Sequence, residues 1–162
     1  MAEKSTKKTI LVPIDFSNCS EAALLKACEF SVCMKAPLAI LHVVHDPAEM
    51  PGYYSKMAKK KQLIRMEDRA REMLDDFITT VIKNHSEAKL LKKMKTILVI
   101  GIPATRILQV AEKINAAMIV MGSRGMTGLK HIMLGSVAEQ VVRFSPIPVT
   151  VVKVAKIEKG KG

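Results

Sequence analysis

The sequence contains no tryptophan and few other aromatic residues, with phenylalanine and tyrosine making up 4% of its 162 residues. Proteins that bind single-stranded RNA or DNA stack bases on interleaved aromatic side chains, and this chain has no such set. Acidic residues are also outnumbered, with 15 Asp and Glu against 26 Lys and Arg, for a net charge of +11. Because the lysines are scattered among the acids, we interpret them as a solvated surface, and nucleic acid is disfavoured as a partner.

Cysteine and long apolar runs are scarce too. The three cysteines, Cys19, Cys28 and Cys33, form no C-x-x-C pair and fall on one predicted helix, so we expect small buried residues rather than disulfides. Every apolar stretch ends well short of the ~18 residues that a membrane span requires. Asp15 interrupts the first stretch before it could serve as a signal sequence. We therefore predict no membrane span and a cytoplasmic protein.

The hydrophobic content is 49%, which suits one domain with a substantial core. We expect a single domain over residues 1–162, with a core of about 7–155 and short basic tails at both ends. Strands are predicted at 7–15, 37–44, 94–101, 116–122 and 147–154. One helix is predicted to begin at Ser17, Asn18 and Glu21, which offer capping groups, and to end near Cys33. Others are predicted from the loop at 46–54 to about Asn84, and at 103–115 and 137–144. Continuous apolar strands that alternate with helices indicate an α/β fold with a buried parallel sheet.

The helix that ends near Asn84 is long and charged. Its apolar residues fall broadly on one face, and we expect them in the core: Leu63, Met66, Met73, Phe77 and Val81.

The most informative segment is the run from Gly122 to Ser136. It places Gly122, Gly125, Gly135 and Ser136 in a G-x2-G-x9-G-S arrangement between a predicted strand and a predicted helix. Glycines let the backbone approach an anion and adopt positive φ, and the first N–H groups of the helix are free donors. The two common nucleotide patterns, G-x4-G-K-[ST] and G-x-G-x-x-G, are absent. The spacing predicts a phosphate-binding loop of another kind, although Gly122 and Gly125 alone are also typical of a turn.

Asp15 follows the first predicted strand, at the same end of the sheet as this loop. Ligands of open α/β sheets bind beyond the carboxyl ends of the strands, where the strand order reverses. If the first and fourth strands are neighbours there, Asp15 faces the loop across one crevice and accepts hydrogen bonds from ribose hydroxyls or adenine. The alternative is an aspartate that caps the following helix.

Catalytic groups are harder to find. His42 and His45 are three residues apart and point to opposite faces of a strand, so they do not form a metal pair. His131 lies inside the glycine loop without a partner close in sequence. Asp15 could help to hold Mg²⁺ through water, but no second carboxylate stands nearby in sequence. We predict binding, with slow hydrolysis at most.

These segments together resemble the universal stress protein family, in its ATP-binding form. The resemblance rests on VPIDFS after the first strand, LHVV in the second, GIP after the third, MGSRGMTGLKHIMLGSVAEQVV, and the final PVTVVKV. It covers nearly the whole chain. It implies an open five-stranded parallel α/β sheet of order 3-2-1-4-5, with helices on both faces, of the Rossmann-like, adenine nucleotide alpha hydrolase-like type, which binds ATP and dimerises.

The resemblance also assigns residues to the ATP molecule. On the adenine and ribose side it places Pro13, Ile14, Asp15, the main chain of Val43, Met121 and Gly122. Around the triphosphate it places Arg124, Gly125, Gly135, Ser136 and Val137. An exposed loop arginine is the alternative interpretation of Arg124.

The final strand is long, apolar and expected at the sheet edge, where free backbone donors invite pairing with a second chain. We predict a homodimer through Ile147–Val154. The leading hypothesis is a non-enzymatic stress or signalling protein whose loop is ordered by ATP, with or without Mg²⁺, and read by an unknown downstream protein. A slow ATP hydrolase and a nucleotide-free dimerisation scaffold are the alternatives.

Overall fold

The computed structural model describes residues 8–45, 60–125 and 134–154. It contains five strands, named in chain order: β1 (Ile10–Pro13), β2 (Leu38–Val44), β3 (Lys95–Ile100), β4 (Met118–Gly122) and β5 (Val149–Val152). Its α-helices are α1 (Asn18–Met34), α2 (Lys60–Asn84), α3 (Pro103–Lys113) and α4 (Ser136–Phe144), and a 3-10 helix, η2 (Ser86–Lys93), follows α2. The predicted alternation of strands and helices is confirmed, with shorter first and last strands than expected.

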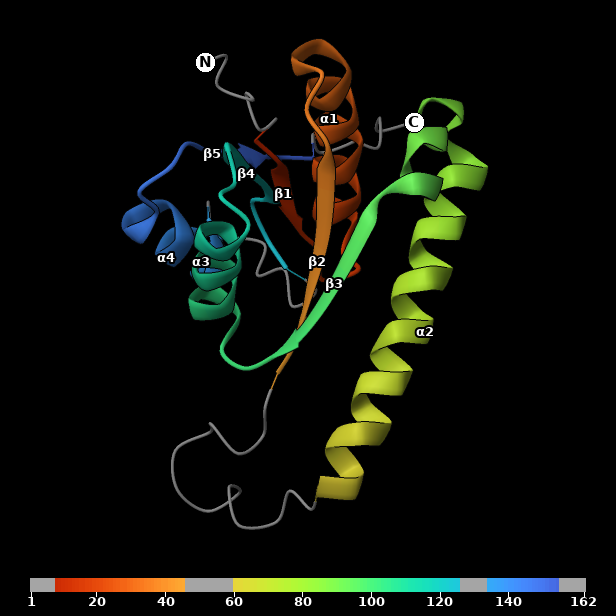
Figure 1. Ribbon diagram of the computed structural model, residues 1–162, viewed down its shortest axis with the longest axis vertical. Coiled ribbons are helices and arrows are strands. Elements are labelled where there is room, and N and C mark those ends of the chain that lie inside the picture. Colours follow the sequence, from red (N-terminus) through yellow and green to blue (C-terminus); the bar gives the residue numbers. More distant parts are fainter. Residues whose placement is uncertain (1–7, 46–59, 126–133, 155–162) are drawn as a thin grey trace, which may run out of the picture.

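The strands form one parallel sheet in the order β3-β2-β1-β4-β5, as the family resemblance implied. Figure 1 shows the sheet between α3 and α4 on one side and α1 and α2 on the other. The chain moves outward from β1 to β3 and then crosses back to β4, so the strand order reverses between β1 and β4. All five carboxyl ends therefore lie at one end of the sheet.

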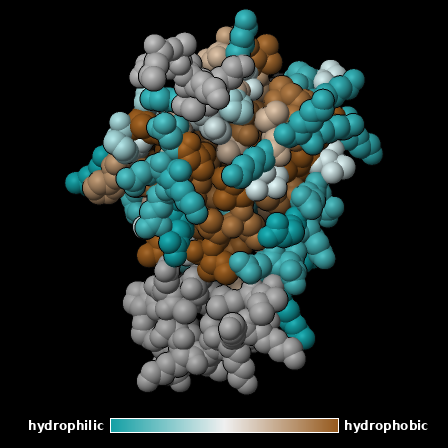
Figure 2. Space-filling model, in the orientation of Figure 1, coloured by the Kyte–Doolittle hydropathy of each residue, from teal (hydrophilic) through white to brown (hydrophobic). Residues whose placement is uncertain are grey.

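Alternation along β1 divides the core into two layers. Ile10 and Val12 pack with α1 and α2, whereas Leu11 packs with α3 and α4, and all three are fully buried. Ile97 and Val99 on β3 are only half-buried beside the layer that contains α3 and α4. The β3 edge of the sheet is therefore covered less fully than its centre. Figure 2 shows the corresponding surface, where apolar side chains gather at the centre of the view between hydrophilic margins.

The predicted cap of α1 is confirmed. The Ser17 side chain accepts the Ser20 N–H at 3.1 Å, which satisfies one of the free donors of the first turn. Asn18 and Glu21, the other predicted capping residues, lie within the first turn of α1, and the Glu21 carboxylate contacts His85 at 3.1 Å.

The predicted core face of α2 needs one correction. Phe77 and Val81 do pack in the core, but Met73 is 42% exposed. The buried face of α2 runs through Leu74 and Ile78. Successive residues of a helix are rotated by about 100° around its axis, so Met73 lies beside this face rather than on it. Met66 is half-buried, and the side chain of Leu63 lies outside the described residues.

The cysteine prediction is correct only for Cys28. Cys28 on α1 is buried in the core layer that α1 and α2 form with the sheet. Cys19 is half-buried, and Cys33 is exposed in the last turn of α1. Cys33 is exposed because α1 runs past the sheet at its carboxyl end, where Val32 and Met34 are exposed as well. Burial, and secondarily the carboxylates of Glu87 and Glu29, raise the pKa of the Cys28 thiol to about 11.

This contrast predicts selective alkylation of the native protein. With iodoacetamide at pH 8, Cys33 should react first because it is exposed. Cys28 should stay unmodified, because it is buried and its pKa of about 11 leaves on the order of a hundredfold less thiolate than an ordinary thiol has. Peptide mass spectrometry of a time course measures the three rates. In urea all three should react alike, and a native Cys28 that reacts as fast as Cys33 would contradict the prediction.

Candidate functional site

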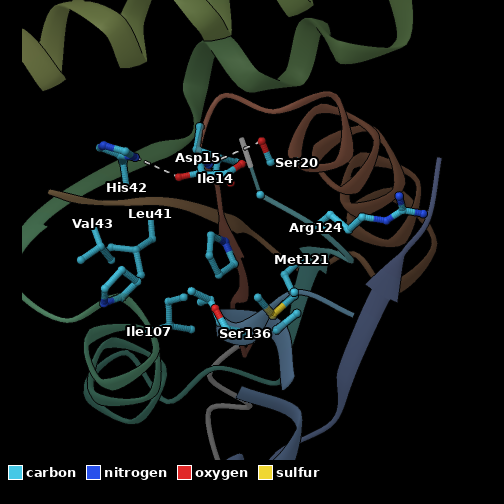
Figure 3. Close-up of a pocket in the computed structure, with 17 residues that line it drawn as sticks. Ile14, Asp15, Ser20, Leu41, His42, Val43, Ile107, Met121, Arg124 and Ser136 are labelled. Carbon is cyan, nitrogen blue, oxygen red and sulfur yellow. Dashed lines mark hydrogen bonds between the residues drawn. The ribbon is translucent and has the colours of Figure 1, made fainter. Parts of the chain in front are cut away.

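A cavity of about 290 Å³ opens at the carboxyl ends of β1, β2 and β4, where the strand order reverses. All eleven residues assigned from the sequence line it: Pro13, Ile14, Asp15, Val43, Met121, Gly122, Arg124, Gly125, Gly135, Ser136 and Val137. Figure 3 shows the labelled ones around the opening, with Val43 on one side and Met121 and Ser136 below Ile14 and Asp15. The walls are mostly apolar, and the charged side chains, Asp15 and Arg124, belong to the two loops that follow β1 and β4.

The loop after β1 is a tight turn built around Asp15. Asp15 Oδ1 accepts the Ser17 N–H at 3.1 Å and the Ser17 Oγ–H at 2.6 Å, and the Asp15 N–H donates to Ser20 Oγ at 3.4 Å. Phe16, between them, has φ 66°. A left-handed conformation costs a bulky residue roughly 1–2 kcal/mol, so the surroundings must hold it there. This turn brings the Asp15 carboxylate to the cavity and also leads into α1. Asp15 therefore faces the crevice, as the first interpretation from the sequence has it, and also belongs to the turn that begins the helix, as the alternative has it.

The loop after β4 reaches Asp15 through Gly125. A Cβ added at Gly125 would lie 2.6 Å from Asp15 Oδ2, so the two loops meet across one crevice, as predicted. Gly122 serves a different purpose, since a Cβ there would lie 2.7 Å from the Cys19 carbonyl carbon in α1.

The positive φ expected of the loop glycines is wrong for the three described ones, because Gly101 is the sole described glycine with positive φ. Close approach, not backbone conformation, is what excludes a side chain at Gly122 and Gly125. Residues 126–133, with His131, lie outside the described residues.

Helix α4 begins at the cavity with N–H donors that have no hydrogen-bond partner among the described residues. Gly135 is its N-cap and donates its own N–H to the Ser123 carbonyl at 2.7 Å. The first bond within the helix runs from the Glu139 N–H to the Gly135 carbonyl at 2.8 Å. The N–H groups of Ser136, Val137 and Ala138 come before it, and all three residues line the cavity. A helix start of this kind favours an anion through its N–H groups and its dipole.

Arg124 lies in the loop between these features. Figure 3 shows its side chain extending away from Met121 and Ser136. Its Nε atom is buried and has no hydrogen-bond partner within the described part of the chain. A buried donor without an acceptor costs about 1–3 kcal/mol, so an acceptor within reach would stabilise this arginine.

Sequence reasoning missed six lining residues: Ser20, Leu41, His42, Pro103, Ile107 and Ala138. Leu41 and His42 directly precede Val43 on β2, so their position was available from the strand prediction. Pro103 and Ile107 come from α3 and are four residues apart on one helix face, but only the three-dimensional packing of α3 brings them to the cavity. Over 8–45, 60–125 and 134–154, no three His, Cys, Asp or Glu side chains group as a metal site.

The fold and the cavity together define an open, doubly wound α/β domain. Its cleft lies where the strand order reverses, which is where such domains bind their ligands. Residues 7–153 match the model of the universal stress protein family, and the chain belongs to that family. It is 35% identical over 153 residues to the universal stress protein MJ0577 of Methanocaldococcus jannaschii, which covers 90% of this chain and 94% of the relative. It is 32% identical over 146 residues to the universal stress protein YxiE of Bacillus subtilis, covering 89% and 97%.

Solved structures of relatives have the same fold. The M. jannaschii structure superposes with a TM-score of 0.68 at 31% identity, covering 93% of this chain and 98% of that one. The universal stress protein of Archaeoglobus fulgidus, solved in complex with dAMP, superposes with a TM-score of 0.56 at 22% identity, covering 90% and 98%. Among the described helices, none combines the length and apolar character needed to cross a bilayer.

Proposed function

We propose that this protein binds ATP in the cavity between the Asp15 turn and the start of α4, as a nucleotide-dependent stress or signalling regulator. The observation that carries the proposal is the meeting of two complementary groups at one cavity. Asp15 supplies acceptors on one side, and the N–H groups of Ser136, Val137 and Ala138, which have no acceptor in the described part of the chain, supply donors on the other. A nucleotide has hydroxyl donors on its ribose and acceptors on its phosphates, which matches this arrangement.

Each part of the nucleotide has residues suited to it. The apolar wall that contains Val43 and Ile107 suits an adenine ring, and the Asp15 carboxylate suits the ribose hydroxyls. The α4 start and Ser136 Oγ suit phosphate oxygens. The Arg124 side chain extends away from Ser136, so its guanidinium would have to turn toward the α4 start before a phosphate could accept from it through paired hydrogen bonds. The A. fulgidus protein in complex with dAMP supports an adenine nucleotide as a ligand of this fold.

We propose binding without rapid hydrolysis. Fast phosphoryl transfer requires a positioned base or metal beside the phosphates. A Mg²⁺ ion, if used, would arrive with the phosphates, and Asp15 is the residue suited to contact its water shell. Contacts of ATP with Gly125 and Gly135 would change a surface that a downstream protein reads.

The test is to release and identify any nucleotide that copurifies with the protein, then to titrate ATP, ADP and AMP by calorimetry with and without Mg²⁺. Phosphate release is measured on the same samples. Binding without phosphate release above the buffer rate supports the regulator. Phosphate release that depends on the loop glycines would instead make the protein an ATP hydrolase. No copurified nucleotide and no binding heat would contradict the proposal and favour a nucleotide-free scaffold.

We further propose that the protein is a homodimer that pairs through β5. This strand is at the sheet edge, and the carbonyls of Pro148 and Val152 accept N–H groups from the β4 side. Because backbone groups alternate in direction along a strand, Val149 and Val151 direct theirs outward. Apolar side chains are exposed on α4 and just after β5, at Phe144 and Val154.

A proline at Val151 should weaken this dimer. Val151→Pro removes one outward N–H from each copy, and edge strands tolerate proline, so the monomer fold should persist. We expect the dimer dissociation constant to rise about tenfold or more, at roughly 1 kcal/mol for each lost hydrogen bond. Analytical ultracentrifugation measures it, with the exposed Val32→Ser on α1 as the control that stays dimeric. A monomeric native protein would overturn the dimer proposal.

A further inference from the structure

Asp15 is followed by an aromatic residue that contacts two other elements. The Phe16 ring centroid lies 4.4 Å from that of His42 on β2, with the planes tilted by 38°. It lies 5.7 Å from the Phe77 ring on α2, edge to face at 68°. Aromatic pairs at these separations attract one another beyond their burial. Helix α2 therefore touches, through Phe77, the turn that carries Asp15.

His42 holds the same turn from the other side of Asp15. Its Nδ1 lies 2.9 Å from the Ile14 carbonyl oxygen. A carbonyl can only accept, so Nδ1 is the nitrogen that carries the proton and donates. Figure 3 shows this bond between β2 and the end of β1. Both neighbours of Asp15 in the chain are thus fixed by side chains, Ile14 through a hydrogen bond and Phe16 through ring contacts.

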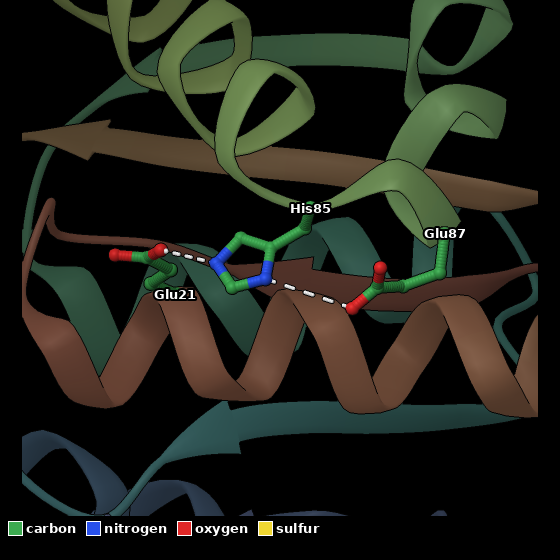
Figure 4. Close-up of polar contacts among 3 residues, drawn as sticks. All are labelled: Glu21, His85 and Glu87. Atoms are coloured by element: carbon green, nitrogen blue, oxygen red, sulfur yellow. Dashed lines mark hydrogen bonds and ion pairs between the residues drawn. The ribbon is translucent and has the colours of Figure 1, made fainter.

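A second contact joins the end of α2 to the start of α1. His85, directly after α2, places Nε2 3.1 Å from Glu21 Oε1 and Nδ1 3.6 Å from Glu87 Oε1 (Figure 4). Glu21 lies in the first turn of α1. The segment from Asp15 to Glu21 is consequently contacted at both ends by α2 and the residue that follows it.

We propose that α2 is a positioning element for the cavity, and that Phe77 holds the Asp15 turn in its ligand-binding shape. This inference rests on the proposed nucleotide function. Phe16 supplies the physical reason, because a non-glycine residue with φ 66° keeps that conformation only where its surroundings impose it. The coupling is reciprocal: if docking of α2 favours ATP binding, ATP must stabilise the docking of α2 by the same factor.

The test compares Phe77→Ala with Ile78→Ala. Ile78 is the next residue of α2 and is buried in the same layer, but it is aliphatic and cannot supply an aromatic ring contact to Phe16. Both variants remove core volume. Phe77→Ala should lower ATP affinity about fivefold, the order of an aromatic pair's contribution, whereas Ile78→Ala should stay within twofold. Phe77→Tyr keeps the ring and should keep the affinity. If Phe77→Ala does not fold, Phe77→Leu takes its place.

A measurement without ligand separates this inference from the nucleotide proposal. Hydrogen exchange of the free protein should speed up at the Phe16–Ser20 amides in Phe77→Ala and not in Ile78→Ala. Absence of ATP binding by the native protein would count against the proposed function, while the exchange result would still test the role of Phe77. Native-like affinity and exchange in Phe77→Ala, or equal losses in both variants, would overturn the positioning role.

Discussion

ATP affinity should fall on the order of a hundredfold when Gly125 is replaced by valine. The Cβ alone would lie 2.6 Å from Asp15 Oδ2, and that carboxylate is held by Ser17. Either the carboxylate moves and loses its bonds, or the loop moves away from the cavity. Overpacking of this kind costs about 1–3 kcal/mol, and here the cost falls on the ligand-binding arrangement, with valine adding two methyl groups at the crevice.

Calorimetry with ATP measures this effect, and Val32→Ser is the control, because Val32 is exposed on α1 and does not line the cavity. This change leaves both loops as they are, so the affinity should stay native-like. If Gly125→Val bound ATP like the native protein, Asp15 and the glycine loop would not form the nucleotide site.

Gly122→Ala should destabilise the fold by about 3 kcal/mol. The added Cβ would lie 2.7 Å from the Cys19 carbonyl carbon and 2.8 Å from the Cys19 Cβ, on the helix that packs against β4. Backbone atoms cannot avoid a clash by changing rotamer, so α1 would have to move away from β4. That movement would open the layer that contains fully buried Leu24 and Val120.

Urea unfolding followed by circular dichroism gives the free energy of unfolding of this variant. Gly125→Ala is its control, because its clash is with a side-chain oxygen at the protein surface rather than with a helix backbone, and its unfolding midpoint should stay closer to that of the native chain. An unchanged midpoint for Gly122→Ala would show that α1 and β4 are less closely packed than the structure places them.

The sequence predicts most of this fold for identifiable reasons. Continuous apolar runs such as 116–122 predicted buried parallel strands, and the Ser17 cap predicted where α1 begins. The strand order is a different case, because apolar runs do not record which strands are neighbours. Order 3-2-1-4-5 followed from the family resemblance, and the hydrogen-bonded pairs now show it.

The candidate site divides in the same way. The juxtaposition of Asp15 and Gly125 was predictable, because carboxyl ends of parallel strands meet at one edge of the sheet. The left-handed residue of the site was not predictable, since it is Phe16 rather than a glycine. The direction of the Arg124 side chain and the arrival of Ile107 from α3 depend on packing between elements far apart in the chain, which no local pattern records.

The contact between Gly122 and Cys19 also bears on how relatives of this chain can diverge. In a relative that no longer binds the ligand, another residue could replace Gly125, because the group that a side chain there would displace is the Asp15 carboxylate at the crevice. Such a relative would still need glycine at 122, where the helix backbone leaves no room for a Cβ. In a set of homologous sequences, position 125 should therefore separate lineages that retained the ligand from those that lost it, while glycine at 122 should persist in both.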